Sequence, residues 1–321
     1  MSSQLQAVSY NSNHRRLVTL QFMSASIAAC GAVTITHPFD VLKTRRQLQN
    51  ELVAANKLDL SRLEKISLRS VWRWEGVSGI YRGLQPAYIY QILMNGVRFA
   101  VYEPTRLFLG KSLIPLTGGQ EWIQVPCNVL SGATAGVLGA AIGSPFNLIK
   151  TRLQSSSPHF STGHQHHYRG MTDAMIRIAR SSEGLLGLYN GVPAAVLRTA
   201  VGSAVQLSSY DFLKEAAVNY AGLRSDNIAV HFAAALTSGV LVCTAMNPFD
   251  VIMTRMYNQS AKQGEALYSG LWDCAKKTVK VEGCRALFKG FVPHYIRIGP
   301  HTLLTLMFLE QVRAILKPII M

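Results

Sequence analysis

The stretch "HPFDVLKTRRQLQ", residues 37–49, follows a segment, residues 17–36, that carries no charged side chain. It brings a proline, an acid and three bases together within a few positions. An uncharged segment of this length is typical of a membrane-spanning helix, so we expect the charged stretch at the polar end of such a helix.

The same pattern occurs three times, at intervals of roughly 100 residues. Pro38, Pro145 and Pro248 open the stretches PFDVLKTRRQ, PFNLIKTRLQ and PFDVIMTRMY. Each is followed by an acid–glycine pair and then by an aromatic residue two positions before a glycine. These pairs are Glu75-Gly76, Glu183-Gly184 and Glu282-Gly283, and the later signals are YRG at 81–83, YNG at 189–191 and FKG at 288–290. The repetition indicates three copies of one structural unit.

Each unit contains two apolar stretches. Residues 17–36, 122–149 and 227–249 are uncharged, whereas 83–102, 184–210 and 290–309 each contain one arginine. A soluble helical array is the alternative, but its helices would be amphipathic, and these stretches are apolar all round. The small residues at 132–136 and 139–143 also favour close packing of membrane helices. We therefore predict six spanning helices.

The expected organisation is an N-terminal tail at 1–14 and repeats at 15–115, 116–222 and 223–321. The formal net charge of +15 fits a partner that is nucleic acid, an anionic membrane surface or an anionic solute. The five cysteines are odd in number and form no CxxC pair, so neither a disulfide framework nor a zinc site is expected. The N-terminus lacks the apolar core of a secretory signal. We find no paired nucleophile and base, so we expect no enzyme, cofactor or metal site.

The proline motif, the acid–glycine pair and a closing acid–base pair, each present three times, resemble the mitochondrial carrier family over residues 15–317. The resemblance implies an all-α membrane protein with six transmembrane helices in a threefold pseudosymmetric bundle. It also implies three short helices on the matrix surface, both termini on the intermembrane side, and a multi-pass monomer in the mitochondrial inner membrane.

In this family, the acid of one proline motif pairs with the base of the next motif around the bundle. The resemblance therefore implies a matrix-side gate in which Asp40 pairs with Lys150 and Asp250 pairs with Lys43. Asp40 and Lys43, one turn apart, would thus be partners of two different helices.

The third link of this gate would join Asn147 to Met253, and neither side chain is charged. Gln47 and Gln154 occupy the position from which the family braces the ring by hydrogen bonds, and the third repeat has Tyr257 there. Because an ion pair of this kind contributes on the order of 1 kcal/mol, its absence should bias the gate modestly.

A second, cytoplasmic-side gate is implied by the closing acid–base pairs at the other end of the bundle. Its three links would be Glu103–Lys214, Asp211–Arg313 and Glu310–Arg106, with Tyr102 and Tyr210 preceding two of the acids.

The candidate substrate site consists of charges inside the apolar stretches. Arg198 and Arg297 lie at equivalent positions after Gly191 and Gly290, and the first repeat has Tyr90 there. Two guanidinium groups with no acid nearby in sequence suit a small dicarboxylate or sulfate, which each can bind through parallel hydrogen bonds. Helix packing is the alternative role. A carboxylate beside each arginine would contradict the assignment.

Four further residues fall on the same helix faces: Thr199, Arg98, Gln206 and His301. Arg98 could raise the positive potential that gathers anions. His301 could carry a co-transported proton, or it could be a neutral histidine hydrogen-bonded within the bundle.

The stretches "AYIYQILMNGVR" (87–98), "GSPFNLIKTRLQS" (143–155), "LRTAVGSAVQL" (197–207), "MNPFDVIMTR" (246–255) and "RIGPHT" (297–302) resemble a branch of the family that moves oxaloacetate and also malonate and sulfate-like dianions. The predicted function is transport of such dianions by alternating access between the two gates. The alternatives are a carrier of malate, succinate, phosphate or an oligocarboxylate, or a basic helical scaffold that binds membrane surfaces or nucleic acid.

Two other signals lie in the polar segments. The resemblance implies cardiolipin binding at the helix N-termini that follow YRG (168–170) and YSG (268–270), where backbone N–H groups favour phosphate. His164, His166 and His167 lie in a Ser/Gly-rich stretch that we interpret as a solvated loop rather than a metal site.

Overall fold

The computed structural model describes residues 2–51, 66–113, 124–160, 162–181, 184–221, 228–259 and 267–320. Within these ranges, regular structure is helical apart from one isolated bridge between Gln49 and Thr162. The prediction of an all-α chain is confirmed. The long helices in these ranges are α1 (Ser2–Leu48), α4 (Leu84–Leu113), α5 (Gln124–Ser155), α7 (Val192–Ala221), α8 (Ile228–Asn258) and α10 (Phe291–Ile320).

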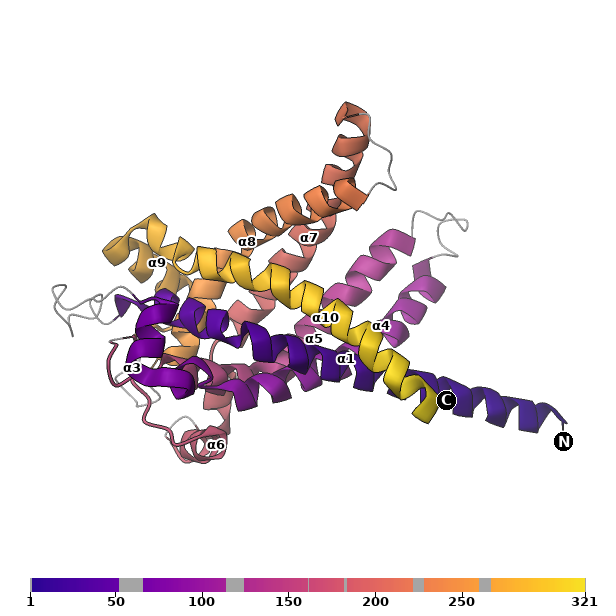
Figure 1. Cartoon of the computed structure of the whole chain (residues 1–321), viewed down its shortest axis with the longest axis horizontal. Coiled ribbons are helices and arrows are strands. Elements are labelled where there is room, and N and C mark those ends of the chain that lie inside the picture. The colour runs from indigo at the N-terminus through magenta and orange to yellow at the C-terminus, as the bar shows by residue number, and fades with distance from the viewer. Residues whose placement is uncertain are drawn as a thin grey trace.

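The long helices contact one another in a closed cycle, in the order α1, α4, α5, α7, α8, α10 and back to α1. The pairs α1–α10, α4–α5 and α7–α8 pack most extensively, and they diverge toward the end of the molecule where both termini lie (Figure 1). We call this the termini end. Toward the opposite end, α1, α5 and α8 each contact the other two.

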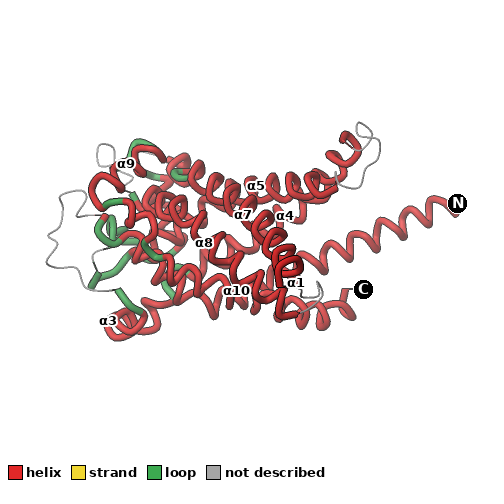
Figure 2. The backbone as a smooth tube through the Cα atoms, turned by 90° about the horizontal axis from the view of Figure 1, so that it is seen from above, coloured by secondary structure: helices red, strands yellow, loops and turns green. Residues whose placement is uncertain are grey.

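The short helices gather at that opposite end. They are α3 (Leu68–Ile80), α6 (Met171–Ala179) and α9 (Leu271–Glu282), and the view in Figure 2 places the described loops there as well. We call it the motif end, because the three proline motifs run into it. Two 3-10 helices, η4 (Gly184–Tyr189) and η5 (Cys284–Phe288), lead into α7 and α10.

The opening stretch of the first motif does not terminate its helix. Pro38, Pro145 and Pro248 all lie inside helices, which continue to Leu48, Ser155 and Asn258. A proline inside a helix removes one backbone hydrogen bond and bends the axis. The charged residues of each motif are thereby carried on a helical extension toward the centre of the motif end.

Small residues allow α5 to approach its neighbours closely. A Cβ atom added to Gly139 would lie 2.9 Å from the sulfur of Met94 on α4, and one added to Gly136 would lie 3.1 Å from Thr199 on α7. Both glycines belong to the small-residue patterns of this helix, which therefore marks contact points with α4 and α7.

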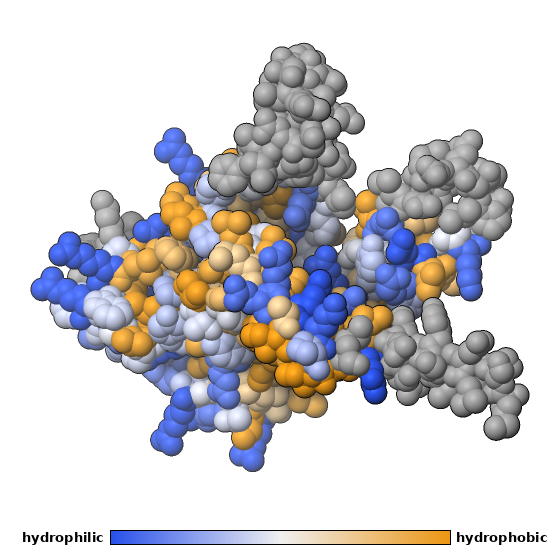
Figure 3. Space-filling view, turned by 45° about the vertical axis from the view of Figure 1, so that its right-hand side comes forward, coloured by the Kyte–Doolittle hydropathy of each residue, from blue (hydrophilic) through white to orange (hydrophobic). Residues whose placement is uncertain are grey.

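Two helices, Arg16–Leu48 and Cys127–Ser155, are long and apolar enough by composition to cross a membrane, among the residues that are described. Helices α4, α7 and α10 each carry an arginine within the apolar stretch, which lowers their hydropathy. Apolar side chains occupy much of the middle of the face in Figure 3, together with a group of hydrophilic ones, and further hydrophilic side chains project at its edges. The two long apolar helices are consistent with a chain that passes through a membrane.

Candidate functional site

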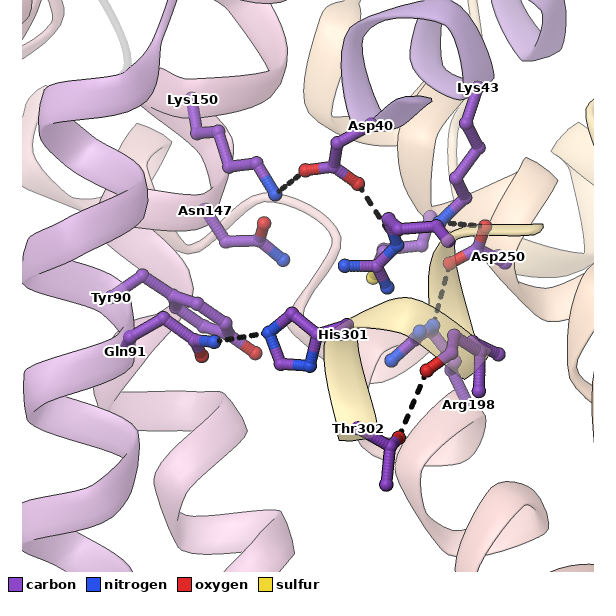
Figure 4. Close-up of a pocket in the computed structure, with 13 residues that line it drawn as sticks. Asp40, Lys43, Tyr90, Gln91, Asn147, Lys150, Arg198, Asp250, His301 and Thr302 are labelled. Carbon is purple, nitrogen blue, oxygen red and sulfur yellow. Dashed lines mark hydrogen bonds and ion pairs between the residues drawn. The ribbon is translucent and has the colours of Figure 1, made fainter. Parts of the chain in front are cut away.

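A cavity of about 240 Å³ lies where the proline motifs converge. Figure 4 shows how its side chains point inward from several helices. Its lining residues come from α1 (Asp40 and Lys43), α4 (Tyr90 and Gln91), α5 (Asn147 and Lys150), α7 (Arg198), α8 (Asp250 and Met253) and α10 (Arg297, Ile298, His301 and Thr302). The cavity thus draws on all three repeats.

Both ion pairs expected between neighbouring motifs are present. The Nζ atom of Lys43 lies 2.5 Å from Oδ2 of Asp250, and Lys150 pairs with Oδ2 of Asp40. Both carboxylates are buried, at 6% exposure for Asp40 and 0% for Asp250. These contacts fasten α1 to α8 and α1 to α5 on the motif-end side of the cavity.

Two glutamines brace these carboxylates. The Gln47 side-chain amide donates to Oδ2 of Asp250 over 2.6 Å, and its oxygen Oε1 accepts from the Thr254 hydroxyl over 2.8 Å. Gln154 lies 3.5 Å from Oδ2 of Asp40 and accepts from Thr44 over 2.9 Å. Both the nitrogen and the oxygen of each buried amide therefore have a hydrogen-bond partner, and this holds the neighbouring aspartate carboxylate in position.

The seam between α5 and α8 has no ion pair among the motif residues. Asn147 and Met253 line the cavity from the two helices. One turn farther along α8, the buried Tyr257 shares a hydrogen bond of 3.0 Å with Ser144. The third motif contact is consequently uncharged.

The expectation that the two arginines have no carboxylate beside them is wrong. Nε of Arg198 lies 2.6 Å from Oδ1 of Asp250, and Nε of Arg297 lies 3.4 Å from Oδ1 of Asp40. The contacts join residues far apart in sequence, so the absence of a nearby acid in the chain did not reveal them. Each aspartate is shared, with one oxygen toward a lysine and the other toward an arginine.

By the criterion stated above, the assignment of a site made of two unpaired arginines fails. The net charge of the cavity gives a different basis for anion binding. Four bases and two acids line the cavity, so its formal charge is +2. The arginine side chains are 20% exposed, whereas those of Asp250 and Asp40 are 0% and 8% exposed. The positive groups thus face the open space, and the acids that partly compensate them lie behind.

Tyr90 lies in the cavity, as does His301. The Tyr90 ring packs on α5, where a Cβ atom on Gly143 would lie 2.8 Å away. His301 shares a hydrogen bond of 3.2 Å with Gln91, which links α10 to α4 across the cavity. The sequence analysis missed Gln91, because an uncharged amide next to Tyr90 gave no distinguishing signal.

Three other candidates do not line this cavity. The Thr199 hydroxyl donates to Ala195 of its own helix over 2.8 Å, and its methyl group faces α5. Arg98 and Gln206 are exposed and lie farther toward the termini end of α4 and α7. The prediction placed all three in the substrate site because the sequence shows which helix face a residue lies on. It does not show how far along the helices the cavity lies.

The acid–base pairs at the termini end are arranged differently. Arg106 lies 3.5 Å from Glu103 of the same helix instead of pairing with Glu310, and both partners are about half exposed. Glu310, Arg313 and Tyr102 are at least partly exposed. The side chains of Asp211, Lys214 and Tyr210 lie outside the described residues. Divergence of the helix pairs explains why the described part of this ring is open while the motif end is closed.

Comparison with known proteins accounts for the three repeats. The sequence profile of the family described as "Mitochondrial carrier protein" matches residues 15–113, 121–221 and 224–319. "Mitochondrial citrate transporter E" of Aspergillus niger is 45% identical, covering 92% of this chain and 93% of its own. "Mitochondrial oxaloacetate transport protein" is 43% identical in Saccharomyces cerevisiae, covering 90% and 87%, and 45% identical in Schizosaccharomyces pombe, covering 90% and 88%. The chain belongs to the mitochondrial carrier protein family.

Proposed function

We propose that this protein transports small dianions across the mitochondrial inner membrane, with oxaloacetate as the principal substrate and malonate and sulfate as related ones. The observation that carries the proposal is the formal charge of +2 on a cavity that draws on all three repeats. Buried charge without compensation is unfavourable, and a solute carrying two negative charges supplies the compensation.

Arg198 and Arg297 are the groups that we expect to hold the substrate. They are the most exposed of the paired charges in the cavity, and planar guanidinium groups bind carboxylate or sulfate in a fixed geometry. Tyr90 and Gln91 on α4 and His301 on α10 supply uncharged polar groups to the same cavity. An anion that binds both arginines competes with Asp40 and Asp250, and so weakens contacts that hold the motif end closed.

The proposed cycle is alternating access within a threefold pseudosymmetric bundle that acts as a monomer. The motif end is the matrix-side gate, and the acid–base pairs of the termini end form the cytoplasmic-side gate. In the conformation described above, the substrate enters from the termini end. Substrate sites near the middle of repeat-built transporters are the usual arrangement.

Cardiolipin is the proposed lipid partner. Gly170 and Gly270 are the N-cap residues of α6 and α9, at the two positions expected to bind its phosphates. The first turns of helices attract anionic oxygens through their backbone N–H groups.

A second candidate substrate is citrate, because one relative is named a citrate transporter. Citrate has three carboxylates, so its negative charge exceeds the formal charge of +2 on the cavity. The comparisons give no support to a nucleic-acid-binding scaffold.

The decisive measurement is uptake by the purified protein in liposomes, with labelled oxaloacetate, malonate, sulfate, malate, succinate, phosphate and citrate. We expect saturable uptake of the small dianions, with oxaloacetate the strongest competitor. If citrate competes more strongly than every small dianion, the substrate class is wrong. If no anion is taken up by folded protein, the transport proposal itself is wrong.

The uncharged contact between α5 and α8, at Asn147 and Met253, leads to a separate prediction. Asn147→Asp with Met253→Lys adds an ion pair between α5 and α8 and leaves the net charge of the cavity unchanged. We expect a stronger closed state, with turnover about fivefold slower and a higher melting temperature, since such a pair contributes on the order of 1 kcal/mol. Unchanged turnover together with unchanged melting temperature would show that this contact does not affect the gate.

A further inference from the structure

The segment between α5 and α6 is built into the motif end. We call residues 156–160 and 162–168 of this segment the clamp loop. Phe160, Thr162 and His166 within it are buried, at 4%, 0% and 6% exposure. The sequence interpretation of a solvated loop is therefore wrong for His166, although His167 is exposed.

The clamp loop has its own hydrogen-bonded framework. The side-chain carbonyl of Gln165 accepts from the Ser157 backbone over 2.8 Å, and its amide donates to the Thr162 carbonyl over 2.8 Å. The Thr162 hydroxyl donates to the carbonyl of Ser155, the last residue of α5, over 2.6 Å. These bonds hold the loop against the end of its own helix.

On one side, the clamp loop is anchored in the first repeat. Phe160 belongs to a buried cluster whose other members are Leu42, Ile66, Val71 and Ile80, all from the first repeat. The Ser156 carbonyl accepts from Arg82 over 2.6 Å and from Arg45 over 3.3 Å. The Ser157 hydroxyl donates to Glu75, which also binds Arg45 through both of its oxygens.

On the other side, the clamp loop and the end of α5 hold the last residues of α8. Nε2 of His166 lies 2.9 Å from the carbonyl oxygen of Asn258, and Ser155 donates to the Asn258 side chain over 2.7 Å. Burial, together with the charge of Arg152, holds the pKa of His166 well below its ordinary value of 6.5. His166 is consequently neutral at pH 7, and its Nε2–H donates to the carbonyl. Arg152 donates to the Tyr257 carbonyl over 2.8 Å.

These contacts lie at the seam that lacks an ion pair. The α1–α8 and α1–α5 seams each have a lysine–aspartate pair, whereas the α5–α8 seam has Asn147 and Met253. We propose that the clamp loop takes the place of the third ion pair: it fastens the ends of α5 and α8 to the first repeat without an ion pair between α5 and α8, and it releases α8 each time the motif end opens. The proposal rests on the proposed alternating access but not on the identity of the substrate.

The test measures opening of this seam directly. Ser144 is fully buried and touches Tyr257 across the seam, so Ser144→Cys places a thiol that reacts with a soluble maleimide only when α5 and α8 separate. Cys284, the exposed native cysteine among the described residues, is replaced by serine, and labelling at position 144 is followed by peptide mass spectrometry in detergent. His166→Ala removes the bond to Asn258, and Phe160→Ala removes the anchor in the first repeat.

We expect His166→Ala to speed labelling by about fivefold, the effect of losing about one net hydrogen bond. Phe160→Ala removes a buried aromatic ring, so we expect it to speed labelling by more than His166→Ala does. His167→Ala is the matched control, since it changes the same residue type at an exposed position of the same loop. Adding Asn147→Asp with Met253→Lys to His166→Ala should return labelling to the starting rate, because an ion pair then holds the seam.

Each outcome decides the proposal. Faster labelling in His166→Ala that the added ion pair reverses supports it. Unchanged labelling in folded His166→Ala and Phe160→Ala, or faster labelling that the ion pair leaves unaltered, overturns it. If His166→Ala does not fold, Phe160→Ala with and without the ion pair gives the same decision. Labelling requires no substrate, so its result is independent of the anion that the protein carries.

Discussion

Replacement of Arg198 or Arg297 by alanine is expected to lower anion uptake in liposomes by about 100-fold, the effect of losing one charge-assisted contact of up to about 3 kcal/mol. Each variant also lowers the formal charge of the cavity from +2. A dianion then meets one guanidinium group where it would otherwise meet two, and we expect KM to rise as well as the maximal rate to fall.

The fold should survive these substitutions, because the acids that the arginines contact keep other partners. Asp250 still has Lys43 and Gln47, and Asp40 still has Lys150. An unchanged melting temperature in detergent is therefore part of the expected result. Arg180→Ala, at an exposed position after α6, is the matched control. Full uptake by folded Arg198→Ala or Arg297→Ala would contradict the substrate assignment.

Exchange of the two charges in Asp40→Lys with Lys150→Asp is expected to leave uptake below about 1% of that of the unsubstituted protein. If Asp40 served only the lysine, the exchange would restore the ion pair. The carboxylate of Asp40 also lies 3.4 Å from Arg297, so the exchange places a lysine against a guanidinium group. Two like charges at this separation, largely removed from water, repel strongly.

A neutral version of the same pair provides the control. Asp40→Asn with Lys150→Gln removes one acid and one base, so the formal charge of the cavity stays at +2. It imitates the uncharged contact that the protein already has between α5 and α8. We expect this double variant to retain measurable uptake. Recovery of uptake in the charge-exchanged variant would show that Asp40 is not shared between Lys150 and Arg297.

The ion pairs at the motif end could be anticipated because the three proline motifs resemble those of the carrier family, in which the acid of one motif pairs with the base of the next. The motifs supply two acids and two bases at the matching positions, Asp40 with Lys150 and Asp250 with Lys43. The partners of Arg198 and Arg297 could not be anticipated in this way. They depend on how close α7 and α10 come to the aspartates of α8 and α1, which is a property of packing and not of spacing.

The burial of the clamp loop is a second feature that the sequence pattern did not predict. A stretch rich in serine, glycine and histidine resembles a surface loop, and its hydropathy gives no reason to bury it. Burial arises because Phe160 finds an apolar site in another repeat, and because backbone groups at the ends of α5 and α8 need partners. Neither condition is visible within the loop itself. Gln91 is a comparable case, since its contact with His301 comes from a different repeat.

The position of Phe160 within the cluster of Leu42, Ile66, Val71 and Ile80 has a consequence for biosynthesis and for engineering. The amino-terminal third of the chain cannot complete its own interior until the ribosome has made a segment well inside the middle third. Chimaeras that exchange whole thirds between relatives should therefore assemble poorly unless residues 156–168 and the amino-terminal third come from the same parent protein.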